Sequence, residues 1–513
     1  MNSIRNISGI LGSQRIKEEY PDYLKDESRY GDGYADSLYF PRNANEVCEI
    51  LRFANDREIP VTISGGRTGI VGGAIPQGGI LISLEYMNRF LGLKEDNSTS
   101  WCIASVEAGM LLKDFIRKIE EYTSRYFYPV DPTEDTAQIG GIVATNASGA
   151  RSFKYGATRR YVQGIKVALA SGELLHIQRG GYFAKEDNTL EGPSLIKVPE
   201  YQMPLIKNTA GYYAKPGMDL IDLFIGSEGT LGVICEIELE LVLKAEGLLT
   251  VMAFFPSEEG AIRFVRDARG DFNKDQKQII DPMSLEYFDS KSLNLLMREG
   301  STSSDIPPIP DNAKAAILFE QEYSEEDLED IYLGWDELLE NYGSSMEETW
   351  GGLDERNLER IKKVRHALPE TVNSIISNRK REHPEIHKMG TDMAVPNEYL
   401  EDMVAFYKKR CQEERLEYVI FGHVGDNHLH VNILPKAPGD MIKAKELYKE
   451  FARKVISFGG TVAAEHGIGK VKKDFLKLMY GAEGLREMAE VKRSLDPKSL
   501  LNRGNLLFSI ACE

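Results

Sequence analysis

The chain has 513 residues, 42% hydrophobic and 28% charged, with a formal net charge of −18. This length exceeds one ordinary hydrophobic core and favours roughly three domain-sized units. The acidic balance argues against a nucleic-acid partner, because nucleic acids bind to basic surfaces. No apolar run is long enough to span a membrane, and the first residues lack the apolar stretch of a signal peptide. We therefore expect a cytoplasmic protein without a transmembrane segment, and peripheral membrane contact stays open.

The first half of the chain alternates helical and strand patterns. Residues 1–35 are polar and are expected to form an N-terminal lead-in outside the core. The expected elements then follow in order: a helix at 44–56, strands at 60–64, 78–90 and 101–110, a helix from 112, a hairpin turning at Ser171-Gly172, and a strand within 229–243. The five cysteines are scattered, so neither a disulfide framework nor an iron–sulfur cluster is expected.

After residue 246 the pattern becomes a second unit of strands and helices. The expected elements are a strand at 248–256, a helix at 257–269, a strand at 315–323, an acidic helix at 324–342, a long helix that Pro369 could interrupt, and a helix at 398–414. Residues 301–313 are expected to be a loop. This order indicates an α+β protein whose second domain is an antiparallel sheet covered by helices.

Two stretches have the composition of anion-binding loops. Residues 64–74 (SGGRTGIVGGA) follow an expected strand, and residues 131–160 contain two further small-residue pairs. Glycine lets backbone N–H groups approach a diphosphate closely. The spacing fits neither a Rossmann fingerprint nor a P-loop. Two such loops suit an extended diphosphate cofactor, although a surface turn is an alternative for the first.

Together with GSEGTLG (226–232), these loops resemble the FAD-binding fold of the vanillyl-alcohol-oxidase type. The resemblance implies a two-subdomain FAD-binding domain over residues 36–245. Many relatives carry Asn in place of Arg67, which adds a cation here. Covalent members use His or Cys in these loops, and the first two loops have neither, so non-covalent FAD is expected. The implied FAD contacts are Gly65, Gly66, Arg67, Thr68, Gly69, Gly72, Pro132, Thr136, Gly140, Gly141, Thr145, Ser148, Gly149, Tyr155, Gly156, Glu228 and Asn502.

Three of the eight histidines fall close together in FGHVGDNHLHVN (421–432). On a strand, His428, His430 and Asn432 would share one face. Glu465 and His466 follow in AAEHGIGK. Two imidazoles and a carboxylate with open positions can bind a divalent metal. A buried polar network without metal explains the same spacing, and both interpretations stay open from spacing alone.

These two motifs resemble the C-terminal signatures of FAD-linked oxidases that act on D-2-hydroxy acids, including D-lactate, glycolate and D-2-hydroxyglutarate dehydrogenases. The resemblance implies that His423, His430 and Glu465 bind a divalent metal, with zinc as first choice. Relatives often carry Asn in place of His428, which is therefore left out of the ligand set. His466 is placed beside the substrate hydroxyl as the catalytic base. The resemblance also implies a cap domain at 246–460 and a C-terminal segment at 461–513 that returns to the FAD domain.

Further matches concern the substrate. Arg365 and Lys388 stand where the family places cations that bind and act on the substrate, and Asn432 is a further expected contact. Pro369 stands where some relatives carry a polar contact. The segment SLEYFD (284–289) is interpreted as structural.

The sequence therefore predicts oxidation of a small D-2-hydroxy acid to the 2-oxo acid. The metal and Arg365 would orient the acid, His466 would take the hydroxyl proton, and the α-hydrogen would pass to the flavin as hydride. A separate acceptor (a quinone, an electron-transfer protein or oxygen) would reoxidise the flavin, and a homodimer stays open. The alternatives are a transferase resembling alkyldihydroxyacetone-phosphate synthase and a non-catalytic flavin- and metal-binding subunit of a glycolate-oxidase-like complex.

Overall fold

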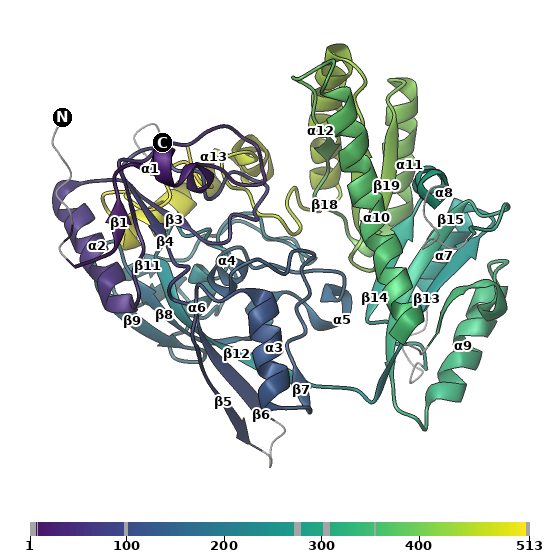
Figure 1. The fold of residues 1–513 in the computed structure, drawn as a ribbon, viewed down its shortest axis with the longest axis horizontal. Coiled ribbons are helices and arrows are strands. Elements are labelled where there is room, and N and C mark those ends of the chain that lie inside the picture. The colour runs from purple at the N-terminus through teal and green to yellow at the C-terminus, as the bar shows by residue number, and fades with distance from the viewer. Residues whose placement is uncertain are drawn as a thin grey trace.

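The computed structural model describes residue 7 and residues 9–96, 101–270, 279–300, 308–352 and 355–508. Two lobes lie side by side, and the chain enters the second lobe after residue 243 and returns to the first near its C-terminal end (Figure 1). Within the described ranges no helix is both long enough and apolar enough to cross a membrane.

The first lobe contains a small mixed sheet in the order β1-β2-β4-β3. Strands β2 and β3 run parallel to β4, and β1 is antiparallel to β2. The expected helix is present as α2, which begins where the side chain of Asn43 accepts the N–H of Glu46 at 3.1 Å. The elements are β1 (Gly12–Ser13), β2 (Ser37–Tyr39), α2 (Ala44–Arg57), β3 (Val61–Ser64) and β4 (Ile80–Ser83).

The N-terminal segment differs from the polar lead-in that the sequence suggested. Ile16 and Leu24 are buried against Leu38, Phe40 and Leu81 in a small apolar cluster. Strand β1 also adds an edge to the first sheet, and the segment includes α1 (Ile16–Glu19) and the 3₁₀ turn η1 (Pro21–Leu24). Composition missed this packing because a few apolar side chains within a polar segment are enough to anchor it.

The second sheet of this lobe has the order β5-β6-β12-β8-β9, with β7 also paired to β12. The predicted hairpin is confirmed: β8 and β9 pair antiparallel, and Gly172 in the turn has φ +81°. The elements are β5 (Phe90–Asp96), β6 (Trp101–Glu107), α3 (Leu112–Tyr122), β7 (Tyr126–Phe127), α4 (Ile139–Ala144), α5 (Ser152–Tyr155), η2 (Thr158–Arg160), β8 (Val162–Ala168), β9 (Leu174–Gln178), β10 (Thr189–Glu191), β11 (Leu195–Lys197), α6 (Ile221–Phe224) and β12 (Val233–Leu243).

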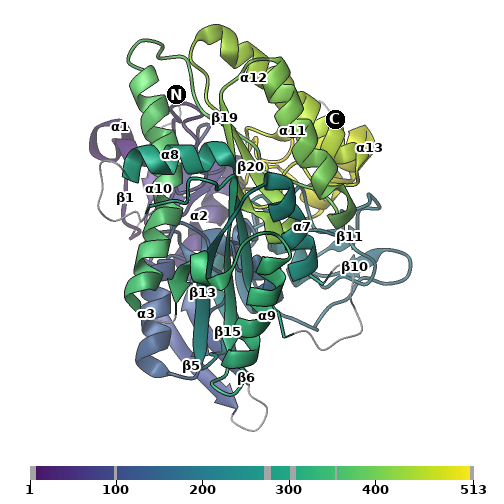
Figure 2. The ribbon, with the colours of Figure 1, turned by 90° about the vertical axis from the view of Figure 1, so that its right-hand side faces the viewer.

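The second lobe is an antiparallel sheet in the order β16-β13-β15-β14-β19-β20-β17, with β18 also paired to β20. Helices cover the sheet (Figure 2). The elements are β13 (Gly247–Phe255), α7 (Glu258–Ala268), β14 (Ser284–Phe288), α8 (Ser290–Gly300), β15 (Ala315–Tyr323), α9 (Leu328–Glu340), η3 (Met346–Glu348), β16 (Trp350–Gly352), α10 (Glu355–Arg379), β17 (Met389–Gly390), β18 (Met393–Ala394), η4 (Asn397–Tyr399), α11 (Leu400–Glu413), β19 (Tyr418–His423), η5 (Val424–Asp426), β20 (His428–Ile433) and α12 (Pro438–Ser457). These elements confirm the α+β class and the helix-covered antiparallel sheet.

Helix α10 continues through Pro369 rather than ending there. Proline lacks the N–H that would otherwise reach the carbonyl of Arg365 one turn earlier. Packing compensates, since Leu368 and Val372 on either side of the proline are buried in the apolar cluster between α10 and the sheet. Most of the expected loop at 301–313 lies outside the described residues.

The C-terminal part of the chain packs on the first lobe. Helix α13 (Lys473–Leu495) is interrupted at Gly481, where φ is +69°. Beyond it the chain runs beside β3: the N–H of Val61 donates to the Leu500 carbonyl at 2.9 Å, and the N–H of Asn502 donates to the Val61 carbonyl at 2.8 Å. Residues distant in sequence thereby complete the first lobe.

Candidate active site

The histidine cluster is built on one hairpin of the second lobe. His423 ends β19 and is paired across the ladder with His428, the first residue of β20. Asn427 takes the left-handed conformation at the turn, with φ +52°, a conformation that Asn tolerates better than most residues. His430 lies two residues farther along β20 on the same face as His428, as alternation predicts.

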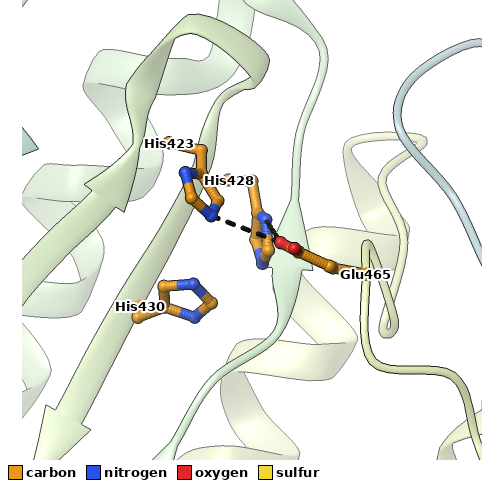
Figure 3. Close-up of side chains that lie close together, drawn as sticks. All are labelled: His423, His428, His430 and Glu465. Atoms are coloured by element: carbon orange, nitrogen blue, oxygen red, sulfur yellow. Dashed lines mark ion pairs between the residues drawn. The ribbon is translucent and has the colours of Figure 1, made fainter. Parts of the chain in front are cut away.

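Four side chains converge at this hairpin (Figure 3). The possible ligand atoms of His423, His428, His430 and Glu465 all lie within 4.8 Å of one another. Oε2 of Glu465 is 3.3 Å from Nε2 of His423 and 3.4 Å from Nδ1 of His428. His428, which the sequence analysis left out of the ligand set, therefore lies inside the group.

The donor set of this group fits a divalent transition metal. Three imidazoles and one carboxylate are the ligands that zinc and its neighbours prefer. His428 is completely buried, and within the described chain neither of its ring nitrogens has a hydrogen bond of good geometry, although Nε2 lies 3.0 Å from Oδ1 of Asp392. A buried imidazole in this situation is costly unless something else satisfies it.

The three histidines of the cluster differ in the direction in which their pKa values are shifted. Burial lowers the pKa of His428 to about 4, although Asp392 opposes the shift. Burial and the neighbouring imidazoles also hold the pKa of His430 well below its ordinary value. For His423 burial acts in the same direction, but Glu286 and Glu465 outweigh it and raise the pKa to about 9. In the absence of an ion, one imidazole of the cluster would thus carry the positive charge.

Glu286 is a site residue that the sequence analysis assigned to structure alone. Its buried carboxylate contacts Nδ1 of His423 and lies 3.8 Å from Nε of Arg365. The predicted substrate cation on α10 is therefore linked to the cluster through one acidic side chain. The signal was present in SLEYFD, because a charged residue inside an otherwise apolar strand needs a partner.

Lys207 is a second residue that sequence reasoning missed. Its side chain is only 5% exposed, and its ammonium lies 3.3 Å from Oε2 of Glu465 and 3.7 Å from Oδ2 of Asp426. Burial would raise the pKa of Glu465, but Lys207 and His423 hold it well below the ordinary value. Lys207 comes from the first lobe, so the two lobes meet at the cluster.

His466 lies beside the cluster with a side chain 30% exposed, against 9% for His423 and 0% for His428. Its ring stacks on that of His430 with centroids 5.6 Å apart. Burial lowers the pKa of His466, and Asp392 acts against that shift. A neutral imidazole in this position can accept a proton.

In the part of the chain that the structure describes, the other two predicted substrate contacts, Asn432 and Lys388, are not linked to the cluster through Glu286 as Arg365 is. Asn432 is buried and donates to the His430 carbonyl at 3.3 Å. Lys388 is half-buried just before β17; burial lowers its pKa, and the positive charge of Arg29 adds to the effect. Among the hydrogen bonds and ion pairs of the described residues, none joins Lys388 to the histidine cluster.

The glycine loops leave room for a cofactor. A Cβ atom added at Gly69 or Gly141 would meet no atom within 4 Å. Close by, Gln138 approaches Gly65, and its Oε1 is a buried acceptor without a partner in the described residues; Ser148 Oγ is in the same situation. Open backbone next to unsatisfied buried polar atoms fits an extended polar ligand such as FAD.

Several predicted cofactor residues are engaged within the protein. The guanidinium of Arg67 stacks over the ring of Tyr23 at 4.0 Å and donates to the Gly65 carbonyl at 3.3 Å. Glu228 accepts the N–H groups of Ile468 and Gly469, each at 2.7 Å. Asn502 donates to the Glu228 carbonyl at 2.7 Å. These contacts tie the loops of the first lobe to the C-terminal segment.

Further predicted cofactor residues lie on the loop at 131–156. Thr145 Oγ1 donates to the Gly141 carbonyl at 2.8 Å, and Tyr155 donates to Glu322 of the second lobe at 2.6 Å. A Cβ at Gly149 would clash with the Asp131 carbonyl at 1.7 Å, which explains the glycine. Of the other predicted contacts, Gly140 lies within α4, and those outside helices and strands are Gly66, Thr68, Gly72, Pro132, Thr136 and Gly156.

A cavity of about 1050 Å³ is lined by both lobes. Arg365 and Glu286 lie in its wall on the side of the second lobe, and Asp131, Pro132 and Arg151 lie in its wall on the side of the first. Because Glu286 also touches His423, the cavity reaches within one side chain of the cluster. A small substrate could therefore approach the cluster and the second glycine stretch, at residues 131–135 and 150–151, from the same space.

The fold of the whole chain is that of vanillyl-alcohol-oxidase-type flavoproteins. A 4-ethylphenol oxidase from Gulosibacter chungangensis superposes with a TM-score of 0.67 at 16% identity, over 96% of this chain and 94% of that one. An alkyldihydroxyacetonephosphate synthase superposes with a TM-score of 0.61 at 15% identity, over 92% of this chain and 76% of that one. At such low identity the likeness defines the fold only.

Sequence comparison defines the family. The C-terminal domain of FAD linked oxidases matches residues 246–506, and a FAD binding domain matches residues 35–178. The glycolate oxidase subunit GlcD of Bacillus subtilis is 30% identical, over 92% of this chain and 88% of its own. A D-lactate dehydrogenase of Anaerostipes hadrus is 29% identical (98% and 95%), and a D-2-hydroxyglutarate dehydrogenase of Stutzerimonas stutzeri is 27% identical (94% and 93%). The chain belongs to the FAD-linked oxidases, and it is a FAD-linked oxidoreductase.

Proposed function

We propose that this oxidoreductase converts a small D-2-hydroxy acid, of the lactate, glycolate or 2-hydroxyglutarate class, to the 2-oxo acid. The names of its relatives support the substrate class. The observation that carries the proposal is the convergence of His423, His428, His430 and Glu465, with His466 stacked against one edge of the group. Such a site can grip two neighbouring oxygens of a hydroxy acid and accept a proton beside them.

In this proposal His423, His430 and Glu465 hold a divalent metal, with zinc as first choice, and His428 is available as a fourth ligand. The depressed pKa values of His428 and His430 suit this role, because only a neutral imidazole offers a lone pair. His423 would exchange its proton for the ion when the metal binds.

Arg365 is proposed to bind the substrate carboxylate from the cavity wall. Its planar guanidinium can form two parallel hydrogen bonds with a carboxylate, which sets the direction of the acid as well as its charge. Lys388 and Asn432 are proposed as further substrate contacts.

His466 is proposed to take the hydroxyl proton at its ring nitrogen. A metal ion in the cluster would supply Lewis acidity that makes this proton easier to remove, and FAD would supply the two-electron acceptor. His423, His428 and Asp392 are buried, which shields one side of the cluster from bulk water, whereas His430, Glu465 and His466 are partly exposed. A separate acceptor (a quinone, an electron-transfer protein or oxygen) completes the proposal.

We further propose that residues 36–245 and the returning segment 461–513 bind non-covalent FAD, while residues 246–460 supply substrate and metal ligands. The open backbone at Gly69 and Gly141 supports the first part of this assignment, and the hairpin that carries the histidines supports the second.

The test is anaerobic mixing of the purified protein, with its native flavin and metal, with D- and L-2-hydroxy acids including lactate, glycolate, malate and 2-hydroxyglutarate. Bleaching of the oxidised flavin absorbance by one D-acid is expected. Chelation should abolish the bleaching, and added Zn²⁺ or Mn²⁺ should restore it.

If no member of this panel bleaches the flavin while flavin and metal are both bound, the proposal is wrong for these acids. A transferase or a non-catalytic subunit would then be the better interpretation. Bleaching that survives complete removal of the metal would remove the cluster from the reaction while leaving the oxidoreductase class intact.

A further inference from the structure

Asp392 is a buried carboxylate that the proposed mechanism does not yet use. It lies between β17 and β18 and is 1% exposed. Its backbone carbonyl accepts the N–H of Ala464 at 3.0 Å, and its side chain accepts the N–H of Glu465 at 3.0 Å and of His466 at 3.1 Å. Three consecutive backbone groups of the C-terminal segment are thus held by one residue of the second lobe.

The two carboxylate oxygens of Asp392 contact different groups. Oδ1 accepts the N–H of Glu465 and lies 3.0 Å from Nε2 of His428. Oδ2 accepts the N–H of His466, lies 2.5 Å from the ammonium of Lys472 and lies 3.6 Å from Nδ1 of His466. All of these neighbours can donate, so the position requires two acceptor oxygens, and only a carboxylate provides both.

This arrangement controls the geometry of the proposed chemistry. Glu465 and His466 are adjacent in sequence, so one fixed peptide orients both a proposed metal ligand and the proposed base. A carboxylate beside Nδ1 favours a proton on that nitrogen, which leaves the lone pair on Nε2. The distance of 3.6 Å can close when substrate binds, because such contacts often tighten only in the loaded site.

We propose that Asp392 is a positioning residue that holds the Glu465–His466 peptide and the Nδ1 edge of His466, so that Nε2 of His466 receives the substrate proton. The inference rests on the proposed function for the role of His466. It adds a residue that touches neither substrate nor flavin but acts through the base.

The test is Asp392→Asn, which keeps the shape but turns one acceptor oxygen into a donor. We expect flavin reduction at saturating hydroxy acid to slow about 100-fold, the lower end of what a positioned general base contributes. The half-saturating concentration should change less than about threefold, because Arg365, the proposed contact of the substrate carboxylate, pairs among the described residues with Glu286 and not with Asp392. Bound flavin should stay at the parent level, since the hydrogen bonds and ion pairs of Asp392 in the described structure go to the C-terminal segment and to His428, and not to the glycine loops.

Two comparisons separate positioning from general damage. Asp289→Asn makes the same chemical change at a carboxylate that is likewise 1% exposed and accepts a backbone N–H, that of Ser292 at the start of α8; we expect its rate to stay within about threefold of the parent. When His466→Gln is already present, adding Asp392→Asn should lower the rate of flavin reduction by less than about threefold. A residue that acts through the His466 imidazole has no further effect once that imidazole is gone.

An independent readout is the crystal structure of flavin-loaded Asp392→Asn, in which we expect a displaced Glu465–His466 peptide and a rotated His466 ring. The proposal is overturned if Asp392→Asn reduces its flavin as fast as the parent does or loses its bound flavin. It is also overturned if Asp392→Asn lowers the rate by the same factor with and without His466→Gln. If no 2-hydroxy acid reduces the parent flavin, the proposed function fails. The structure of the variant then still decides the role of Asp392, since an unmoved peptide and ring would refute it.

Discussion

At the scale of single residues, Glu286 links the cluster to the cavity. Burial raises the pKa of its carboxyl, but His423 and Arg365 outweigh burial and lower it, so Glu286 is ionised. Arg365 is 3.8 Å away and is therefore partly compensated before any substrate arrives. A substrate carboxylate must compete with Glu286 for this guanidinium, which makes the geometry of the guanidinium as important as its charge.

Arg365→Lys should weaken substrate binding. Lysine keeps the charge but offers a point donor instead of a planar fork, so we expect the half-saturating concentration of hydroxy acid to rise about tenfold. Steady-state kinetics measure this change. The matched control is Arg360→Lys, the same chemical change on the same helix at a position outside the cavity wall, which should stay close to the parent. Equal behaviour of the two variants would remove Arg365 from the binding site.

At the scale of elements, a buried acid starts α8. Oδ1 of Asp289 accepts the N–H of Ser292 at 2.8 Å and the hydroxyl of Ser292 at 2.7 Å, so it caps the helix. Burial raises the pKa of Asp289 to about 6 from an ordinary 3.8, although the contacts with Ser292 oppose the shift. The native state thus binds this proton more tightly than the unfolded chain does, and stability is lost as the pH rises through this range.

Asp289→Asn should therefore become relatively more stable as the pH rises. The amide oxygen can still accept the helix N–H, but it has no charge to bury. We expect the melting temperature of the variant, minus that of the parent, to increase between pH 4 and pH 7. The corresponding change in the free energy of unfolding reaches at most about 3 kcal/mol. Scanning calorimetry across pH measures the difference. A difference that is flat or falls over this interval would show that the carboxyl is not protonated in the native state.

At the scale of the whole molecule, α5 and its preceding turn join the two lobes. Arg151 lies 3.3 Å from Glu320 of the second lobe and 3.7 Å from Asp131 of the first. Lys154 lies 3.2 Å from Glu322, and Ser152 donates to Asp426 at 2.7 Å. The same loop carries predicted FAD contacts, so the lobe interface and the cofactor site share one segment.

Arg151→Met should destabilise this junction. The substitution keeps much of the side-chain volume but leaves the shielded carboxylate of Glu320 and the half-exposed carboxylate of Asp131 without their cation, at a cost of about 1–2 kcal/mol. A lower melting temperature measures the loss. Arg263→Met is the matched control, because Arg263 forms an exposed pair with Glu259 within α7 at 2.8 Å and should cost less than about 0.5 kcal/mol. Equal losses would mean that the interface does not depend on this contact.

The sequence by itself determined the class of fold, the hairpin at Ser171-Gly172 and the position of the glycine loops, and the resemblance to FAD-linked oxidases added the expectation that Glu465 joins the histidine hairpin. These features depend on local patterns, namely alternation, glycine placement and motif order, that survive without knowledge of packing.

Only the tertiary structure decided which polar groups meet. His428 joined the cluster, Glu286 joined Arg365 to His423, and Lys207 and Asp392 reached Glu465 and His466 from distant segments. It also buried Ile16 and Leu24 of a segment that looked like a lead-in. The physical reason is that a single buried charge or a single apolar side chain produces no repeating pattern in the sequence. Each must be compensated by whatever the fold brings beside it.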